Sequence, residues 1–222
     1  MSAISENIRV LKQDLPSSVK LIAVSKSKPV TDIMEAYNSG QRCFGENRVQ
    51  ELLQKKDILP SDIEWHLIGH LQSNKVKFIV PFINMIQSVD SYKLLKVINS
   101  ESSRLHKVVD CLLQIKIAEE ESKFGFSIDE IVEMLGSEDF ISLTSMRLCG
   151  VMGIGTLTEN DEKTRSEFRY LVKCFIRLKN TYFANNNRFR EISMGMSDDY
   201  HVAVNEGSTM VRIGSLIFGK RF

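Results

Sequence analysis

The stretch at residues 19–45, VKLIAVSKSKPVTDIMEAYNSGQRCFG, decides the fold because it holds a complete strand–helix–strand unit. An apolar run at 19–25 predicts a buried strand, and a helical pattern follows from about 31 to 39. Gly40 then stands where helices commonly end in a left-handed residue. A second, short strand is expected at 42–45. Because the first strand is apolar almost throughout, this unit predicts parallel strands covered by the connecting helix.

The same alternation continues to the end of the chain. Further strands are predicted at 64–68, 85–89, 108–117, 148–154, 191–194 and 210–218. The helices between them are predicted at 47–56, 73–80, 91–105, 128–135, 159–182 and 198–205, and an amphipathic helix precedes the first strand. Eight such units favour an α/β fold in which residues 1–222 form a single (β/α)8 TIM-type barrel with an extra N-terminal helix. An open doubly wound sheet fits this count less well.

Length and composition agree with one barrel domain. The chain has 222 residues, 43% of them hydrophobic, which suffices for one sizeable core. Its formal net charge of +1 gives no electrostatic reason to expect nucleic acid or an anionic membrane as a partner. No apolar run approaches the ~20 residues that span a bilayer, and the N-terminal stretch lacks the apolar segment of a signal peptide. We expect a soluble, cytoplasmic monomer.

The cysteines and histidines do not predict a metal site. Neither CxxC pairs nor zinc spacing occur, so we expect buried free thiols at Cys43, Cys111, Cys149 and Cys174. No histidine falls at metal-binding distance in sequence from an acid, and His66 in WHLIG is predicted to be a hydrogen-bonded interior residue. The acidic run at 119–121 is expected to be an exposed loop, and Asp198 and Asp199 to be solvated acids at a helix start.

In a barrel of this kind the functional face lies at the carboxyl ends of the strands. Lys26 directly follows the apolar run LIAVS and should point into or over the barrel mouth. Partial desolvation there favours a neutral amine, which is a good nucleophile. The competing interpretation is a lysine that extends from a strand end into solvent.

Two segments near the C-terminus predict an anion site. SMGMSDD, at 193–199, places Ser197 as a helix N-cap followed by acids, which is either an ordinary helix start or a donor group for an anion. MVRIGSLIFG places Gly214 where backbone approaches a ligand closely. Phosphate groups commonly bind near strands seven and eight of such barrels. Together with Lys26, these segments predict a phosphorylated carbonyl ligand held as an imine.

Seven segments carry a resemblance that runs along almost the whole chain. They are AVSKSKP, FGENRVQE, WHLIGHLQSNK, ESKFGF, GVMGI, SMGMSDD and GSTMVRIGSLIFG, in this order. Together they closely resemble the YggS/PROSC family of homeostasis proteins that bind pyridoxal 5′-phosphate (PLP). That family is similar in fold to the N-terminal barrel domain of alanine racemase.

The resemblance implies a role for each residue of a PLP site. Lys26 would be the Schiff-base lysine, with Lys28 and Lys123 as the alternative lysines. Arg212 would contact the pyridine nitrogen, although a salt bridge at the barrel rim is the competing interpretation. The phosphate would be held by Ser197, Gly214 and Ser215, and Asn47 would face the ring.

The resemblance also implies a function in PLP homeostasis without robust catalytic turnover. Alanine racemases carry a second, C-terminal β domain with a catalytic tyrosine, whereas this chain ends at Phe222. The expected partners are PLP itself and apo forms of PLP-dependent enzymes. Two alternatives stay open: a PLP-dependent amino-acid racemase or lyase of unknown substrate, and a barrel that binds another phosphate ester without covalent attachment.

Overall fold

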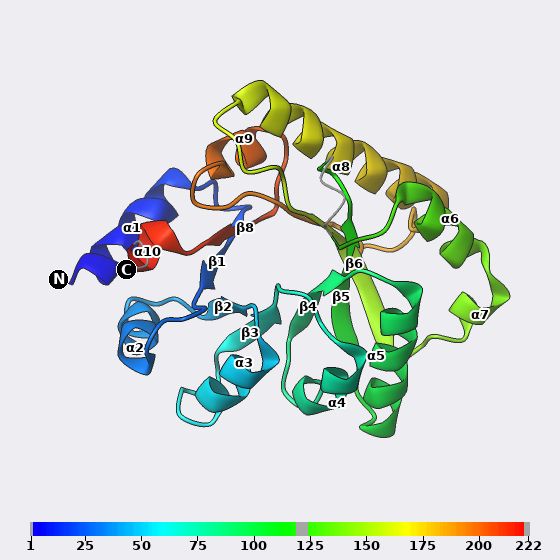
Figure 1. Cartoon of the computed structure of the whole chain (residues 1–222), viewed down its shortest axis with the longest axis horizontal. Coiled ribbons are helices and arrows are strands. Elements are labelled where there is room, and N and C mark those ends of the chain that lie inside the picture. The colour runs from blue at the N-terminus through cyan, green and yellow to red at the C-terminus, as the bar shows by residue number, and fades with distance from the viewer. Residues whose placement is uncertain (1, 119–123, 220–222) are drawn as a thin grey trace.

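The computed structural model describes residues 2–118 and 124–219, and within them eight parallel strands close into a barrel. Each strand pairs with the next along the chain, and β1 closes the ring by pairing with β8. Figure 1 shows the helices around this ring, which confirms the predicted (β/α)8 barrel. The strands are β1 (Lys20–Val24), β2 (Cys43–Glu46), β3 (Glu64–Leu67), β4 (Met85–Val89), β5 (Val109–Ile115), β6 (Met146–Gly153), β7 (Glu191–Ser193) and β8 (Met210–Ile213).

Every predicted helix is present near its predicted place, and two further short helices were not predicted. The N-terminal helix is present and lies beside the last helix at the left of Figure 1. Along the chain the helices are α1 (Ala3–Asp14), α2 (Val30–Asn38), α3 (Val49–Lys56), the 3-10 turn η1 (Ser73–Lys75), α4 (Val76–Ile79), α5 (Tyr92–Arg104), α6 (Ile128–Gly136), α7 (Glu138–Ile141), α8 (Asp161–Tyr182), α9 (Tyr200–Asn205) and α10 (Ser215–Phe218). In the described part of the chain, none of them has the length and apolar character needed to cross a membrane.

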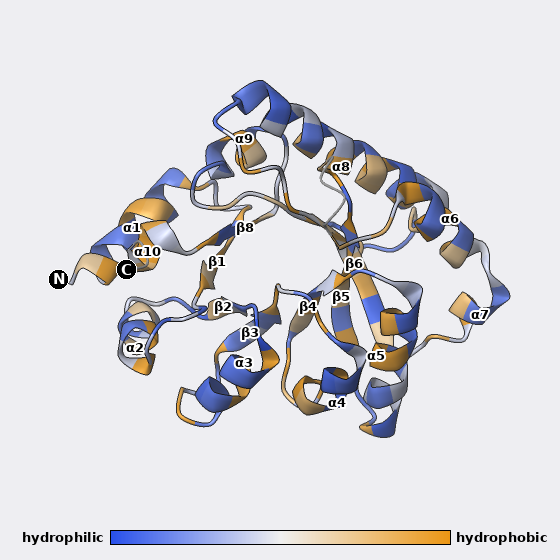
Figure 2. Cartoon of the chain, in the orientation of Figure 1, coloured by the Kyte–Doolittle hydropathy of each residue, from blue (hydrophilic) through white to orange (hydrophobic). Residues whose placement is uncertain are grey.

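Strand side chains alternate between two cores. On β1, Leu21 and Ala23 pack among the helices, whereas Ile22 points into the barrel. Figure 2 shows the matching pattern, with hydrophobic residues along the strands and on the helix sides that cover them. The apolar cluster inside the barrel consists of Ile22, Cys43, Met85, Leu112, Cys149, Met152 and Met210. All four cysteines are free and buried, as predicted.

The eighth strand is shorter than predicted. It ends at Ile213, and the rest of the apolar run forms the short helix α10. The carbonyl of Gly214 accepts the N–H groups of Ile217 and Phe218, which closes a helical turn. A short apolar run has the same composition in a buried strand and in a buried helix, so periodicity did not separate the two. Helix α7 was likewise not predicted.

The loop after β7 corrects the predicted helix start. Helix α9 begins at Tyr200 with Asp199 at the N-cap, so Ser197 is not the N-cap residue. The loop turns at Gly195, whose φ of +94° favours glycine. Asp198 is exposed as expected, but Asp199 is half-buried and its Oδ1 accepts the backbone N–H of Met196 at 2.5 Å. The acid at the helix start therefore shapes the loop rather than being solvated.

Candidate functional site

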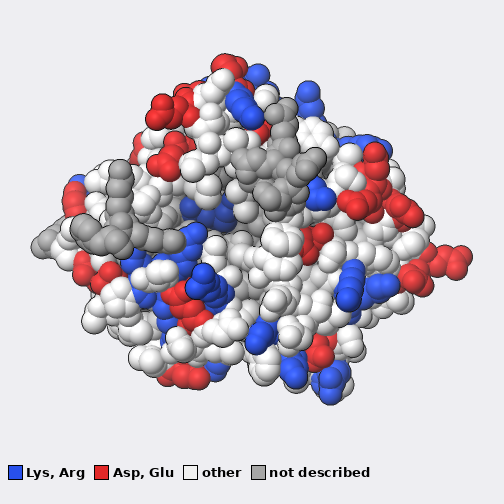
Figure 3. Space-filling model, viewed as in Figure 1, with Lys and Arg blue, Asp and Glu red and all other residues white. Residues whose placement is uncertain are grey.

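A cavity of about 370 Å³, which we call the mouth cavity, opens at the carboxyl ends of the strands. Its volume is within the range of small-molecule pockets. Figure 3 shows Lys and Arg side chains gathered left of centre on this view, over β1 and β2. The six residues predicted to bind a cofactor all line this one cavity, although they come from four separate loops or strand ends. They are Lys26, Asn47, Ser197, Arg212, Gly214 and Ser215.

Lys26 sits in a tight turn that directly follows β1. The N–H of Lys28 donates to the carbonyl of Ser25 at 3.1 Å and closes the turn. Ser27 adopts a left-handed φ of +61°, which is uncommon for a residue with a Cβ. Its backbone N–H donates to Oε1 of Glu51 at 2.5 Å, so a carboxylate from α3 holds this conformation. Lys26 itself is half-buried and lines the cavity.

A buried charged cluster, which we call the turn clamp, lies under this turn and consists of Ser25, Glu46, Glu51 and Lys55. The Lys55 ammonium donates to Glu46 at 2.7 Å, to Glu51 at 2.6 Å and to the Ser25 carbonyl at 2.8 Å. The Ser25 hydroxyl also donates to Glu46, at 2.7 Å. Burial raises the pKa of Glu46, and hydrogen bonds from Lys55 and Ser25 oppose that rise. The turn clamp fixes both ends of the Lys26 turn to β2 and α3.

The alternative lysines differ from Lys26 in their surroundings. Lys28 lines the same cavity, but its Nζ donates to the carbonyls of Phe218 and Gly219 at 2.9 and 3.3 Å. These carbonyls lie at the C-terminal end of α10, where a positive charge is favoured. Lys28 therefore ties the first strand loop to the last helix. Lys123 and the acidic run at 119–121 lie outside the described residues.

Arg212 is a buried interior cation rather than a rim residue. Only 4% of its surface is exposed, and its Nη1 and Nη2 donate to Ser193 Oγ at 2.7 Å and to the Gly153 carbonyl at 2.9 Å. Burial lowers the pKa of Arg212 to about 10, and the Asp199 carboxylate opposes this shift. The guanidinium stays charged at neutral pH. Within residues 2–118 and 124–219 it forms no salt bridge, which disfavours the rim-salt-bridge interpretation.

Small polar groups complete the lining of the cavity. Ser197 Oγ accepts the backbone N–H of Gly214 at 3.3 Å, which links the β7 loop to the end of β8. Ser215 follows as the first residue of α10. Asn47 directly follows β2, and its buried Oδ1 has no hydrogen-bond partner in the described structure. An amine, a buried cation, hydroxyls and an unpartnered amide oxygen suit a small anionic ligand with hydroxyl and carbonyl groups.

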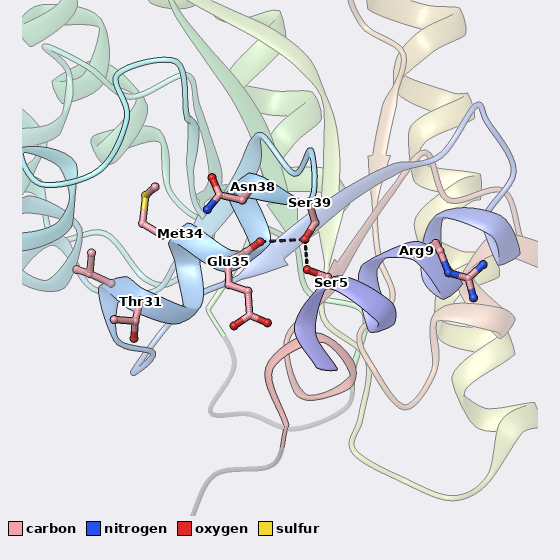
Figure 4. A pocket seen from close by; sticks show the side chains of 8 residues that line it. Ser5, Arg9, Thr31, Met34, Glu35, Asn38 and Ser39 are labelled. Atoms are coloured by element: carbon pink, nitrogen blue, oxygen red, sulfur yellow. Dashed lines mark hydrogen bonds between the residues drawn. The ribbon is translucent and has the colours of Figure 1, made fainter. Parts of the chain in front are cut away.

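Two other hollows lack this combination. A smaller cavity of about 250 Å³ shares Asn47, Ile68 and Ile154 with the mouth cavity, and His70 lines it with its Nδ1 2.7 Å from Asp90 Oδ2. A larger, open groove of about 690 Å³ lies between α1 and α2 (Figure 4), away from the strand ends. Its charged lining residues are Arg9 and Glu35, and it has no lysine. The mouth cavity is therefore the candidate site.

Metal-ligand spacing is absent from the sequence, but the fold brings one histidine close to a cysteine and an acid. Potential ligand atoms of Cys43, Glu64 and His66 lie within 4.8 Å of one another. They meet because β2 and β3 pair Cys43 with Glu64, and His66 is two residues further on the same strand face. Sequence spacing missed this trio and the turn clamp because each group joins residues of more than one element. The available signals were the Glu51–Lys55 spacing of four on a predicted helix and the charged Glu46 in a buried strand.

Comparison with known proteins places this geometry in context. The model of the alanine racemase N-terminal domain family matches residues 1–221. The pyridoxal phosphate homeostasis protein of Haemophilus influenzae is 38% identical over 208 residues, which cover 92% of this chain and 86% of that protein. The counterpart in Schizosaccharomyces pombe is 35% identical over 229 residues, covering 100% of this chain and 94% of that protein.

Two solved structures are similar to this chain in fold. PipY of Synechococcus elongatus, solved with PLP bound, is 36% identical, with a TM-score of 0.87 over 97% of this chain and 100% of that chain. An alanine racemase of Clostridium difficile, 14% identical, has a TM-score of 0.79 over 99% of this chain and 57% of that chain. The second likeness concerns the fold alone.

Proposed function

Because the chain belongs to the family of pyridoxal phosphate homeostasis proteins, we propose that it binds PLP as a Schiff base on Lys26 and serves PLP homeostasis. The observation that carries this proposal is the meeting of six predicted residues in one cavity at the barrel mouth. PLP, when bound to an amine, supplies an electron-withdrawing ring and a reversible carbon–nitrogen linkage. We further propose that the protein is a cytoplasmic monomer and that it supplies PLP to the apo forms of PLP-dependent enzymes.

Attachment to Lys26 requires a neutral amine at the cavity wall. The Lys26 nitrogen attacks the aldehyde carbon, a C=N bond forms and the aldehyde oxygen leaves as water. The turn clamp supports this role because it holds the Lys26 turn in a left-handed conformation beside the cavity. Lys28 suits it less well, because its ammonium holds the first strand loop to the C-terminal end of α10 through the carbonyls of Phe218 and Gly219.

The remaining polar groups are proposed to anchor and orient the cofactor. Ser197, with Gly214 and Ser215, is placed to donate to the phosphate, and the unpartnered Asn47 Oδ1 suits a ring hydroxyl. Arg212 keeps its protons at neutral pH, so it can donate to the pyridine nitrogen but not protonate it. An unprotonated ring withdraws electrons weakly, which suits a carrier better than a lyase.

Borohydride reduction followed by peptide mass spectrometry tests the proposed attachment. We expect the purified protein loaded with PLP to be yellow and to carry the reduced adduct on Lys26. Lys26→Ala should lose the visible band and the adduct, whereas Lys28→Ala should keep both. An adduct that persists mainly on Lys28 or Lys123 would make the assignment wrong. Phosphate-dependent binding without any adduct would favour the non-covalent phosphate-ester barrel.

An amino-acid racemase or lyase is the second candidate, and one observation favours it. His70, paired with Asp90, lines the cavity next to the mouth and is 40% exposed at its side chain, so it offers an acid/base group nearby. A positioned acid/base typically contributes about 10²–10⁴-fold to the rate. We nevertheless expect the PLP-loaded protein to racemise alanine or serine no faster than free PLP. A turnover of about 1 s⁻¹ or more, lost in His70→Ala, would establish the enzyme instead.

A further inference from the structure

A line of polar side chains crosses the apolar interior of the barrel. Arg212 Nη1 donates to Ser193 Oγ at 2.7 Å, and Ser193 Oγ donates to Gln87 Oε1, also at 2.7 Å. Gln87 Nε2 lies 2.8 Å from His66 Nδ1. All four side chains are buried and come from β8, β7, β4 and β3. We call Arg212, Ser193, Gln87 and His66 the interior relay.

We propose that the interior relay holds the Arg212 guanidinium in the orientation that faces the mouth cavity, and that Gln87 and His66 are positioning residues for it. This inference rests on the proposed function, because it concerns the group that would meet the cofactor ring. It adds residues that do not line the cavity.

The direction of every hydrogen bond in the relay follows from Arg212. A guanidinium has only donors, so Ser193 Oγ must accept from it. The Ser193 proton is then directed to Gln87 Oε1. The Gln87 amide nitrogen consequently faces His66 Nδ1 and also the Met210 sulfur, 3.8 Å away, which can only accept. The amide nitrogen of Gln87 thus donates to His66 Nδ1. His66 must therefore be the tautomer with its proton on Nε2.

The reverse orientation of the Gln87 amide is disfavoured. It would direct two donors at Ser193 Oγ and leave the hydroxyl proton without an acceptor, since the described structure gives Ser193 Oγ no third partner. Burial lowers the pKa of His66 to about 3, so the ring stays neutral and Nδ1 remains an acceptor.

The relay ends at His66, beside a cysteine and an acid. His66 meets Cys43 and Glu64 there, residue types that can bind zinc. The Nε2 proton occupies the one ring nitrogen that Gln87 leaves available. The ammonium of Lys20 already lies 3.2 Å from Glu64 Oε2. A zinc ion tightly bound through His66 Nε2 would therefore contradict the assigned tautomer.

The relay matters because the two groups that accept hydrogen bonds from Arg212, the Gly153 carbonyl and the Ser193 hydroxyl, differ in rigidity. The Gly153 carbonyl belongs to β6 and is fixed by the sheet. The Ser193 hydroxyl is a rotor, and its proton would compete for other acceptors without Gln87. Gln87 thus sets the Ser193 lone pair toward Arg212, and His66 keeps the Gln87 amide from turning over.

NMR of the protein without PLP tests the polarity of the relay. In protein labelled with ¹⁵N-histidine, we expect His66 to be neutral at pH 5 to 8, with Nε2 protonated and Nδ1 not. Gln87→Glu replaces the donor that faces His66 by an acceptor, so the proton should move to Nδ1. A wild-type His66 protonated on Nδ1, or stoichiometric zinc binding that displaces the Nε2 proton, would overturn the relay.

A matched pair of variants tests the positioning of Arg212. Gln87→Met has a similar size but no acceptor for Ser193, and should shift the visible band of the PLP-loaded protein and weaken PLP retention about tenfold. Gln87→Glu restores an acceptor and should return both toward wild type. If both variants match wild type in band and affinity, Gln87 does not position Arg212. If wild type forms no Lys26 adduct, the proposed function fails, while the NMR result still decides the relay.

Discussion

Ser197 and Gly214 come from different strand ends and meet through a single hydrogen bond of 3.3 Å. The bond is long for an N–H···O contact, so the hydroxyl and the N–H can exchange it for a better partner. A phosphate group, which accepts strongly from both, is such a partner. The part of the mouth cavity around Ser197 and Gly214 is thus suited to an anion.

Ser197→Ala should weaken PLP binding about tenfold or more, because a hydrogen bond to a charged group contributes about 1.5–3 kcal/mol. The Schiff base on Lys26 should still form at high PLP concentration. Fluorescence or absorbance titration of the protein with PLP measures the change. Ser5→Ala, in the groove between α1 and α2, is the matched control and should bind like wild type. Equal affinities in all three proteins would remove Ser197 from the site.

At the scale of elements, every strand and most helices could be placed from the sequence. Whether a short apolar segment at the end of an element is strand or helix could not. Strand β4 was placed at its observed bounds, because an apolar run flanked by turn residues has one good solution there. The run after Ile213 became α10 instead of strand, because hydrogen bonds to Gly214 decide it and composition does not. The N-cap prediction for Ser197 was wrong because the loop after β7 runs two residues further before α9 begins, and the Asp199 side chain accepts the Met196 N–H within it.

The turn clamp joins three elements, and Lys55 is its centre. Lys55→Met would leave the buried Glu46 carboxylate without its ammonium, and removing one partner of a buried ion pair costs about 3–5 kcal/mol. We expect the free energy of unfolding to fall by about that amount, with PLP binding impaired as the Lys26 turn loosens. Urea unfolding measures the change.

Lys56→Met provides the control for the turn clamp, because the ion-pair partner of Lys56 is the exposed Asp57 and its ammonium otherwise lies over the Phe82 ring, 5.1 Å from the centroid. Its effect should be about 1 kcal/mol or less. A Lys55 variant as stable as its Lys56 counterpart would show that the clamp does not support the Lys26 turn.

At the scale of the whole molecule, closure of the barrel creates what linear spacing could not predict. Lys26 and Arg212 are far apart in the chain, but Lys26 directly follows β1 and Arg212 lies on β8, which pairs with β1. That neighbourhood follows from the barrel prediction, so the mouth residues could be found from the sequence. The interior relay could not be predicted, because its contacts depend on the register and tilt of four strands. No local pattern in the sequence marks Gln87 or Ser193 as its members.

His66 makes the stability of the whole barrel depend on pH. Burial lowers its pKa in the folded protein to about 3, against about 6.5 for an ordinary histidine in the unfolded chain. Below pH 6.5 the unfolded chain therefore takes up a proton that the folded barrel excludes, and stability falls as the pH drops toward the folded pKa. The titratable groups that face the ring, Lys20, Cys43 and Glu64, lie at the same end of the barrel.

Between pH 7 and pH 5 this proton should cost the folded state about 2 kcal/mol. His66→Gln removes the titration, so its free energy of unfolding should change less over that interval, even if it is lower at pH 7. Urea unfolding at the two pH values gives the difference directly. His201→Gln, at a side chain that is 69% exposed, should keep the wild-type dependence. Equal pH dependence in wild type and His66→Gln would mean that the buried ring is protonated in the folded barrel, and the neutral tautomer required by the interior relay would fail with it.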